Sequence, residues 1–349
     1  MAAGKTALVL GGGAPHCTLM SGALLALHRA GLRFDLVSMA GGGSVVGLLY
    51  LSPKGLCPEQ ALENTINFGV SDLIYSAFPV NYKMFSKSGP LADAFREIWL
   101  TLPAVRAAMN QHGMSKAQKL VSDWILFIGA MMCPTNVNYF STGFCAHVPF
   151  IEEIVDFDAL KHVPADCLLS AYCIDEDQIV TFGKGEITLH HFRAAMSFPF
   201  IYPPYRLNGK HYYEGAAYQC LPLARLVERE NIENIVLIDV MTLNLISPPR
   251  NLWDAYSQSI IVPLVANARN ELAMFQDWIR FRYSPQAPIM PRSAVPAPVR
   301  LFCVKFEIPE QHRPGILDWS SSNLETMFHL GFNAGNRFLA DPQNRSLLQ

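Results

Sequence analysis

The sequence predicts an α/β fold in which helices cover a mostly parallel sheet. Two segments typical of buried strands, residues 6–10 and 34–40, are each followed by a run of glycines and then by a helical pattern. A third apolar segment, residues 235–240, has the composition of a fully buried strand. Because strand patterns occur near both ends of the chain, we expect one sheet and a single domain over residues 1–349.

Each element of the first fifty residues has a recognisable beginning and end. Residues 6–10 lead into three glycines, and the helical periodicity of residues 19–30 stops at Gly31, a residue typical of helix C-termini. The second strand, residues 34–40, runs into a Gly-Gly-Gly-Ser turn, and we expect the next helix to begin at Val45. This alternation of strand and helix is typical of parallel neighbours joined by crossover helices.

Residues 55–150 are mainly helical in pattern, and we expect them to form an insertion that covers the functional site. Its uncharged stretch from Trp124 to Cys133 is about half as long as a membrane-spanning helix. One helical face there is apolar, which fits either a core helix or an element that contacts lipid, in a pocket or at a membrane. The residues of this face are Leu120, Val121, Trp124, Ile125, Ile128, Met131 and Met132.

The C-terminal half continues the alternation. Residues 251–282 have the pattern of a long helix, which we expect to kink at Pro263. A capping box formed by Ser322 and Glu325 is expected to begin the last helix. Further strands are expected at residues 167–173, 178–182 and 299–306.

The charge balance argues against a nucleic-acid-binding protein, which would normally show a basic excess. The chain has 27 basic and 29 acidic residues, a formal net charge of −2. Only 16% of its residues are charged, against about 25% in a typical soluble domain. We therefore expect an unusually apolar surface, compatible with a homodimer interface, with peripheral membrane contact or with a pocket for an apolar ligand.

The eight cysteines are scattered, with no C-x-x-C pair and no Cys/His cluster at zinc spacing. We interpret them as mostly buried free thiols of a reducing compartment. The apolar stretch near the N-terminus is too short for a signal peptide. We expect a cytoplasmic protein that uses no metal and no cofactor.

Three kinds of site contain glycine-rich turns of this type. A dinucleotide fingerprint beginning at Gly11 would need a glycine where the chain has His16. A phosphate-binding loop ending at Lys5 and Thr6 lacks its preceding strand and its first glycine. In the third kind, one turn offers backbone amides to an oxyanion and the other presents a nucleophile, as acyl transfer requires.

A later motif supports the third kind of site. Residues 194–204 read AAMSFPFIYPP, residues 208–216 read NGKHYYEGA, and Leu221-Pro222 follows. Together with the two glycine turns, in this order, the motif resembles the patatin-like acyl hydrolases over most of the chain, from Leu8 to about residue 240. That family has a G-G-G-x-R/K-G loop, a G-x-S-x-G turn, an A-x-x-x-P…P stretch and a D-G-G/A turn before L-P.

The resemblance implies a patatin-like α/β/α sandwich with a mostly parallel central sheet. It also implies a Ser–Asp dyad without histidine, in which the Asp of the D-G-G/A turn takes the serine proton and the glycine loop binds the oxyanion. The implied substrates are acyl lipids or related esters.

The glycine loop departs from the family pattern. Gly12, Gly13 and Ala14 align with its three glycines, and the amides of Gly13 and Ala14 are expected to bind the oxyanion. His16 replaces the Arg/Lys and is a candidate acid or base. Cys17 replaces the last glycine and, at a helix N-terminus, is an alternative nucleophile.

The nucleophile position has two alignments, and neither matches the family. One places Gly43 there and the other places Ser44, with Val46 where a small residue normally permits the tight turn. At the dyad partner, Glu214 replaces Asp and is one methylene longer. We predict Ser44 and Glu214 as the catalytic pair, with a helix-capping role for Ser44 as the alternative.

Three functions remain open. The first is an acyl hydrolase or acyltransferase in which Ser44 attacks a lipid or an acyl (thio)ester and Glu214 is the base. In the second, Glu214, with His16, performs acid/base chemistry without a covalent intermediate, as in a repurposed biosynthetic enzyme. The third is a non-catalytic acyl-binding protein.

Overall fold

A computed structural model describes residues 4–13, 16–147, 151–223, 226, 232–241, 245–246, 248–249, 251–282, 299–315 and 318–347. The chain folds around one eight-stranded sheet with the order β5-β6-β3-β2-β1-β7-β8, and β4 pairs with β3 outside this path. The pairs among β1, β2, β3, β7 and β8 are parallel, whereas β4, β5 and β6 join by antiparallel pairing. The predicted mostly parallel sheet is therefore confirmed.

The strands are β1 (Lys5–Leu10), β2 (Leu36–Met39), β3 (Asp166–Cys173), β4 (Gln178–Gly183), β5 (Tyr205–Leu207), β6 (Lys210–Glu214), β7 (Ile232–Ile238) and β8 (Arg300–Cys303). The helices of the sandwich are α1 (Cys17–Arg29), α2 (Gly42–Leu51), α3 (Pro58–Asn64), α9 (Phe157–Leu160), α10 (Leu189–Ala195), α11 (Gly215–Tyr218), α12 (Leu252–Arg282) and α13 (Ser321–Ala340).

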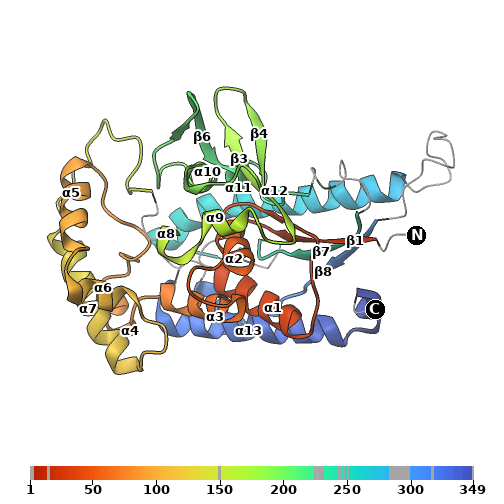
Figure 1. The fold of residues 1–349 in the computed structure, drawn as a ribbon, viewed down its shortest axis with the longest axis horizontal. Coiled ribbons are helices and arrows are strands. Elements are labelled where there is room, and N and C mark those ends of the chain that lie inside the picture. The colour runs from red at the N-terminus through yellow and green to blue at the C-terminus, as the bar shows by residue number, and fades with distance from the viewer. Residues whose placement is uncertain are drawn as a thin grey trace.

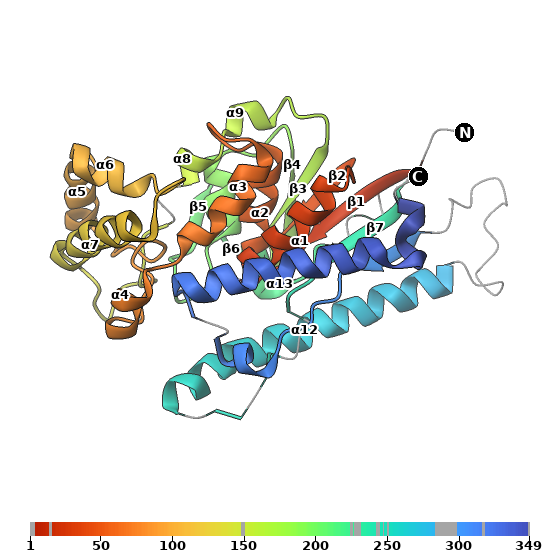
Figure 2. The same cartoon turned by 90° about the horizontal axis from the view of Figure 1, so that it is seen from below.

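The two faces of the sheet carry separate apolar cores. Because side chains alternate along a strand, Leu8 and Leu10 of β1 pack into the core shared with α1, α2 and α13. Ala7 and Val9 face the other core, which α12 covers. Figure 2 shows α13 running alongside α1. This arrangement is the expected α/β/α sandwich.

Glycine permits the close approach of α1 and α13. A Cβ at Gly331 would overlap the carbonyl oxygen of Leu19, and one at Gly335 would lie 2.7 Å from the carbonyl oxygen of Ala23. The two helices therefore pack with their backbones nearly in contact, which fixes the start of α1 relative to the sheet.

Within the predicted insertion, residues 55–150, α3 packs on α1 and α2 of the sandwich. The rest of the segment holds α4 (Asp72–Ala77), α5 (Pro90–Trp99), α6 (Pro103–Met109) and α7 (Lys116–Met132), and α8 (Ile151–Ile154) follows it. Figures 1 and 2 show α4–α7 gathered at one end of the molecule, away from the N-terminus. After α7 the chain runs back toward the sheet and contacts the segment before β5. The amides of Phe144 and Cys145 donate to the carbonyl oxygens of Phe200 and Ile201, at 3.1 and 2.8 Å.

The predicted long helix around Pro263 is α12. Two predicted element boundaries were wrong. α2 begins at Gly42, not at Val45. The N-cap of α13 is Ser320, so Ser322 lies inside the first turn instead of capping it. In each case tertiary contacts, rather than local side-chain preference, set the boundary.

Candidate active site

The glycine loop after β1 lies against the turn that follows β6. The amide of Gly12 donates to the carbonyl oxygen of Cys220 at 3.0 Å, and a Cβ at Gly12 would lie 2.7 Å from the Cβ of Ala216. Gly13 has a φ of +125°, a conformation that requires glycine. Within the described part of the chain, the Gly13 amide has no acceptor. Ala14, predicted to share the oxyanion role, lies outside the described residues.

The turn after β2 has its strained residue at Gly41. This residue has φ +50° and ψ −130°, and α2 begins directly after it. A sharp strand-to-helix turn with one strained residue is the geometry that exposes a nucleophile in serine hydrolases. Gly41 therefore occupies the nucleophile position, which the two alignments with the family pattern placed at Gly43 or Ser44.

Gly43 has a packing role in the same turn. Its amide donates to the carbonyl oxygens of Gly11 and Ala40, at 3.1 and 3.0 Å. A Cβ at this position would lie 2.5 Å from the carbonyl oxygens of Leu10 and Gly11. Gly43 is thus the small residue that lets α2 begin against the end of β1. A five-residue pattern ending at Gly43 has Gly41 at its centre, a register that differs from both predicted alignments.

Ser44 lies three residues beyond the strained turn, in the first turn of α2. Its side chain is completely buried, and its hydroxyl has no hydrogen-bond partner among the described residues. Its amide donates to the carbonyl oxygen of Gly41 at 2.8 Å. The structure therefore does not bring the Ser44 hydroxyl into hydrogen-bonding contact with Glu214, and Ser44 does not cap α2, whose N-cap is Gly41.

A tight hairpin places Glu214. The two-residue loop between β5 and β6 is Asn208-Gly209, with φ of +51° and +82°, as in a type I′ turn. β6 ends at Glu214, whose amide donates to the carbonyl oxygen of Ser197 at 3.0 Å. The Asn-Gly pair is the sequence signal from which this hairpin could have been predicted.

The carboxyl group of Glu214 lies against Gly41. A Cβ at Gly41 would overlap Oε1 of Glu214 and would lie 2.8 Å from the Cβ of Ala216. Glu214 is buried, and desolvation raises its pKa to about 8. The predicted dyad acid thus faces the strained turn, with no side chain between the carboxyl group and the Gly41 backbone.

Aromatic and polar side chains form the wall beside Glu214. Tyr202 is buried, and its hydroxyl donates to the carbonyl oxygen of Met84 at 3.5 Å. Ser197 donates from its hydroxyl to the carbonyl oxygen of Arg193 at 2.7 Å and lies 3.0 Å from Nε2 of His147. Because this hydroxyl already donates to a carbonyl, the Ser197–His147 contact positions the end of α10 rather than activating a nucleophile.

The other predicted acid/base and nucleophile candidates are deactivated by their surroundings. His16 is buried at the N-cap of α1, and desolvation lowers its pKa to about 4, so it is neutral near pH 7. Burial raises the pKa of Cys17 to about 12, the opposite of the lowering expected at a helix N-terminus. No group of three metal-ligating side chains occurs in the ranges that the structure describes.

Among known proteins, a family model matches most of this chain. Residues 8–227 match the family model described as patatin-like phospholipase. No curated protein matches the chain. Among solved structures, the chain is similar to VipD from Legionella pneumophila, with a TM-score of 0.38 and 11% sequence identity over 97% of this chain and 67% of that chain.

Proposed function

This chain belongs to the patatin-like phospholipase family, a family of lipid acyl hydrolases, and we propose that it acts on an acyl ester or thioester without a serine nucleophile. In this proposal, the carboxylate of Glu214 is a general base that activates water. The reaction is hydrolysis in one step, with no acyl-enzyme intermediate.

The position of Glu214 against Gly41 carries the proposal. Gly41 stands at the strained turn and contributes no side chain, while Oε1 of Glu214 lies where a Cβ at Gly41 would be. The longer acid thus fills the space that the missing nucleophile leaves. Water is then the nucleophile that this carboxylate is best placed to activate.

Two backbone amides are assigned to the oxyanion. Gly42 is the first residue of α2, so its amide has no acceptor within the helix, and it has none elsewhere among the described residues. The Gly13 amide is likewise without an acceptor there. The positive end of α2 adds to the stabilisation of a negative oxygen at this point. The Gly12 amide takes no part, because it donates to Cys220.

The proposed step is balanced in atoms and protons. Glu214 removes a proton from water as the water oxygen forms a bond to the acyl carbon. Collapse of the tetrahedral intermediate breaks the bond to the leaving group, which takes the proton from Glu214. Only the ionised carboxylate is a base, so with a pKa of about 8 the rate should rise with pH up to about 8 and then level off.

A second candidate function is non-catalytic acyl binding. The hydrogen bond from the Gly12 amide to the carbonyl oxygen of Cys220 favours this function, because that amide is then unavailable to bind an oxyanion. In that function Glu214, protonated near pH 7 by its raised pKa, would offer a hydrogen bond to a bound acyl group.

Two variants and one reagent distinguish these possibilities. We expect Glu214→Gln to lower hydrolysis of a long-chain nitrophenyl ester by about 10²- to 10⁴-fold, and Ser44→Ala to leave it unchanged. A long-chain fluorophosphonate, followed by peptide mapping, should leave the wild-type chain unlabelled. An adduct on Ser44 would overturn the proposal in favour of covalent catalysis, and fatty-acid binding without any hydrolysis would favour the binding role.

A further inference from the structure

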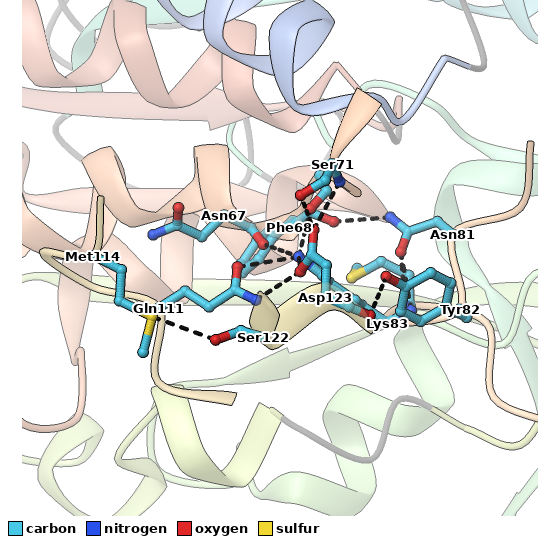
Figure 3. A network of polar contacts seen from close by, with 12 residues as sticks. Asn67, Phe68, Ser71, Asn81, Tyr82, Lys83, Gln111, Met114, Ser122 and Asp123 are labelled. Carbon is cyan, nitrogen blue, oxygen red and sulfur yellow. Dashed lines mark hydrogen bonds and ion pairs between the residues drawn. The ribbon is translucent and has the colours of Figure 1, made fainter. Parts of the chain in front are cut away.

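Helix α7 has a charged residue on its buried side and apolar residues on its solvent-exposed side. Asp123 is buried, and its carboxylate lies 2.6 Å from the ammonium of Lys83. It also accepts from the Gln111 amide at 2.7 Å and from the Ser71 amide and hydroxyl at 2.7 and 2.6 Å. Figure 3 shows these groups converging on Asp123. The network fixes the rotation of α7, because breaking it would leave a charge buried without a partner.

The opposite side of α7 presents apolar side chains to solvent. Five apolar residues of α7 are 41–63% exposed, and their spacing places them on one face of the helix. We call this surface the docking face; it consists of Val121, Trp124, Ile128, Met131 and Met132. The interpretation of this helix as a core element is therefore wrong. Soluble proteins rarely leave such a continuous apolar face uncovered, so it is expected to contact something apolar.

The chain after α7 adds exposed aromatic rings. Tyr139 is 96% exposed and Phe140 is 88% exposed. Phe200 is also exposed and packs on Phe144 with ring centroids 4.6 Å apart. Phe200 has a φ of +73°, which is unfavourable for a bulky residue. An exposed aromatic ring held in a strained conformation is typical of a contact site.

The segment that carries most of this surface has no charged residue. Residues 124–151 contain no Asp, Glu, Lys or Arg. No described helix is long and apolar enough to cross a membrane. A surface of this kind suits the boundary between headgroups and acyl chains, where Trp and Tyr place an apolar ring and a polar tip.

A cavity opens beside the docking face. It has a volume of about 430 Å³ and is lined mainly by apolar side chains of α5, α7 and residues 78–87, with Lys83, Lys87, Arg96 and Glu153 as its charged lining residues. Met131, Phe78 and Val80 line it and are also exposed to solvent. The ammonium of Lys87, on its wall, donates to the carbonyl oxygens of Met131 and Cys133 at 3.3 and 2.8 Å. An apolar cavity that opens on an apolar face favours an acyl chain over the surface of a second protein.

We infer that the docking face, with Tyr139 and Phe140, binds the surface of a phospholipid membrane and that the adjoining cavity accepts one acyl chain. The inference does not depend on the proposed catalysis. It assigns an apolar site to the insertion, and Glu214 is not among the residues that line its cavity.

Binding to vesicles of ether-linked phosphatidylcholine tests this inference. These lipids cannot be hydrolysed at an ester, so the result is independent of the active site. We expect the wild-type chain to sediment with the vesicles and to stay bound at high salt, because the face is uncharged. Trp124→Lys with Ile128→Lys should lower the partition coefficient by at least about tenfold, since each buried apolar side chain contributes about that factor.

Two further variants complete the design. Tyr139→Ser with Phe140→Ser changes only exposed side chains and should also weaken binding. Met274→Lys with Phe281→Lys alters two exposed apolar residues of α12 and is the matched control, which should bind like wild type. The inference is overturned if wild type does not bind, if the control loses binding equally, or if light scattering shows a wild-type dimer that the Trp124 and Ile128 changes convert to a monomer.

Discussion

Adding one methyl group at Gly41 tests whether the Glu214 carboxyl group occupies the strained turn. A Cβ there would overlap Oε1 of Glu214 and would lie 2.8 Å from the Cβ of Ala216. The backbone at Gly41, with φ +50° and ψ −130°, costs a non-glycine residue about 1–3 kcal/mol. Overpacking adds about 1–3 kcal/mol. We therefore expect Gly41→Ala to lower the free energy of unfolding by about 2–6 kcal/mol.

A double-mutant cycle separates the steric part from the backbone part. Glu214→Asp withdraws the carboxyl group by up to one carbon–carbon bond, about 1.5 Å, and so relieves the overlap while leaving the backbone strain and the Ala216 contact. We expect Gly41→Ala to cost about 1–3 kcal/mol less in the Glu214→Asp background than in wild type.

Equilibrium urea denaturation, followed by far-UV circular dichroism and tryptophan fluorescence, measures all four proteins of the cycle. Gly185→Ala is the control, because a Cβ at Gly185 meets nothing within 4 Å. Equal costs of Gly41→Ala in the two backgrounds would refute the placement of Glu214, and with it the basis of the proposed function.

Four further predictions follow from the described contacts. Burial raises the pKa of Glu214 from its usual 4.5 to about 8, so the free energy of unfolding should fall as the pH rises from about 4.5 to about 8, and Glu214→Gln should flatten that part of a pH series of urea denaturations. Asp123→Ala should cost about 3–5 kcal/mol in the same assay, because it leaves the buried ammonium of Lys83 without its counter-charge; a loss below 1 kcal/mol would contradict the role given to this network. Gly331→Ala should lower the thermal unfolding midpoint, since its Cβ would overlap a carbonyl oxygen of α1, whereas Gly185→Ala should not. Gly41→Ser with Glu214→Asp places a hydroxyl beside a carboxyl group, and a long-chain fluorophosphonate should then label position 41; an unlabelled, folded protein would show that this turn does not present a nucleophile.

Much of the sandwich could be predicted because its elements have local signals. The apolar run of β1 and the periodicity of α1 predict a strand and a helix from nearby residues alone. The order of the glycine turns, the proline-containing stretch and the turn at Glu214 also pointed to the family that the match over residues 8–227 shows. These features can be recognised in a single sequence because each depends on residues that are only a few positions apart.

The register of the active-site turn depended on the tertiary structure. Three successive glycines allow several alignments, and the choice is made by the backbone: Gly41 takes the positive φ, while Gly43 packs on the end of β1. Neither the φ of one glycine nor the burial of Ser44 is visible in residue types, because both depend on where β1 and α2 meet.

Burial and orientation were also decided by packing. Glu214 is a turn carboxylate in the sequence, and only its enclosure raises its pKa. The face of α7 that points outward could not be chosen from periodicity, because its apolar stripe fits a core helix equally well. The buried partners of Asp123 turn that stripe toward solvent. The sequence alone indicated the family and most strands and helices of the sandwich, although not the hairpin of β5 and β6, whereas contacts between distant segments determined which side chains are available for chemistry and for binding.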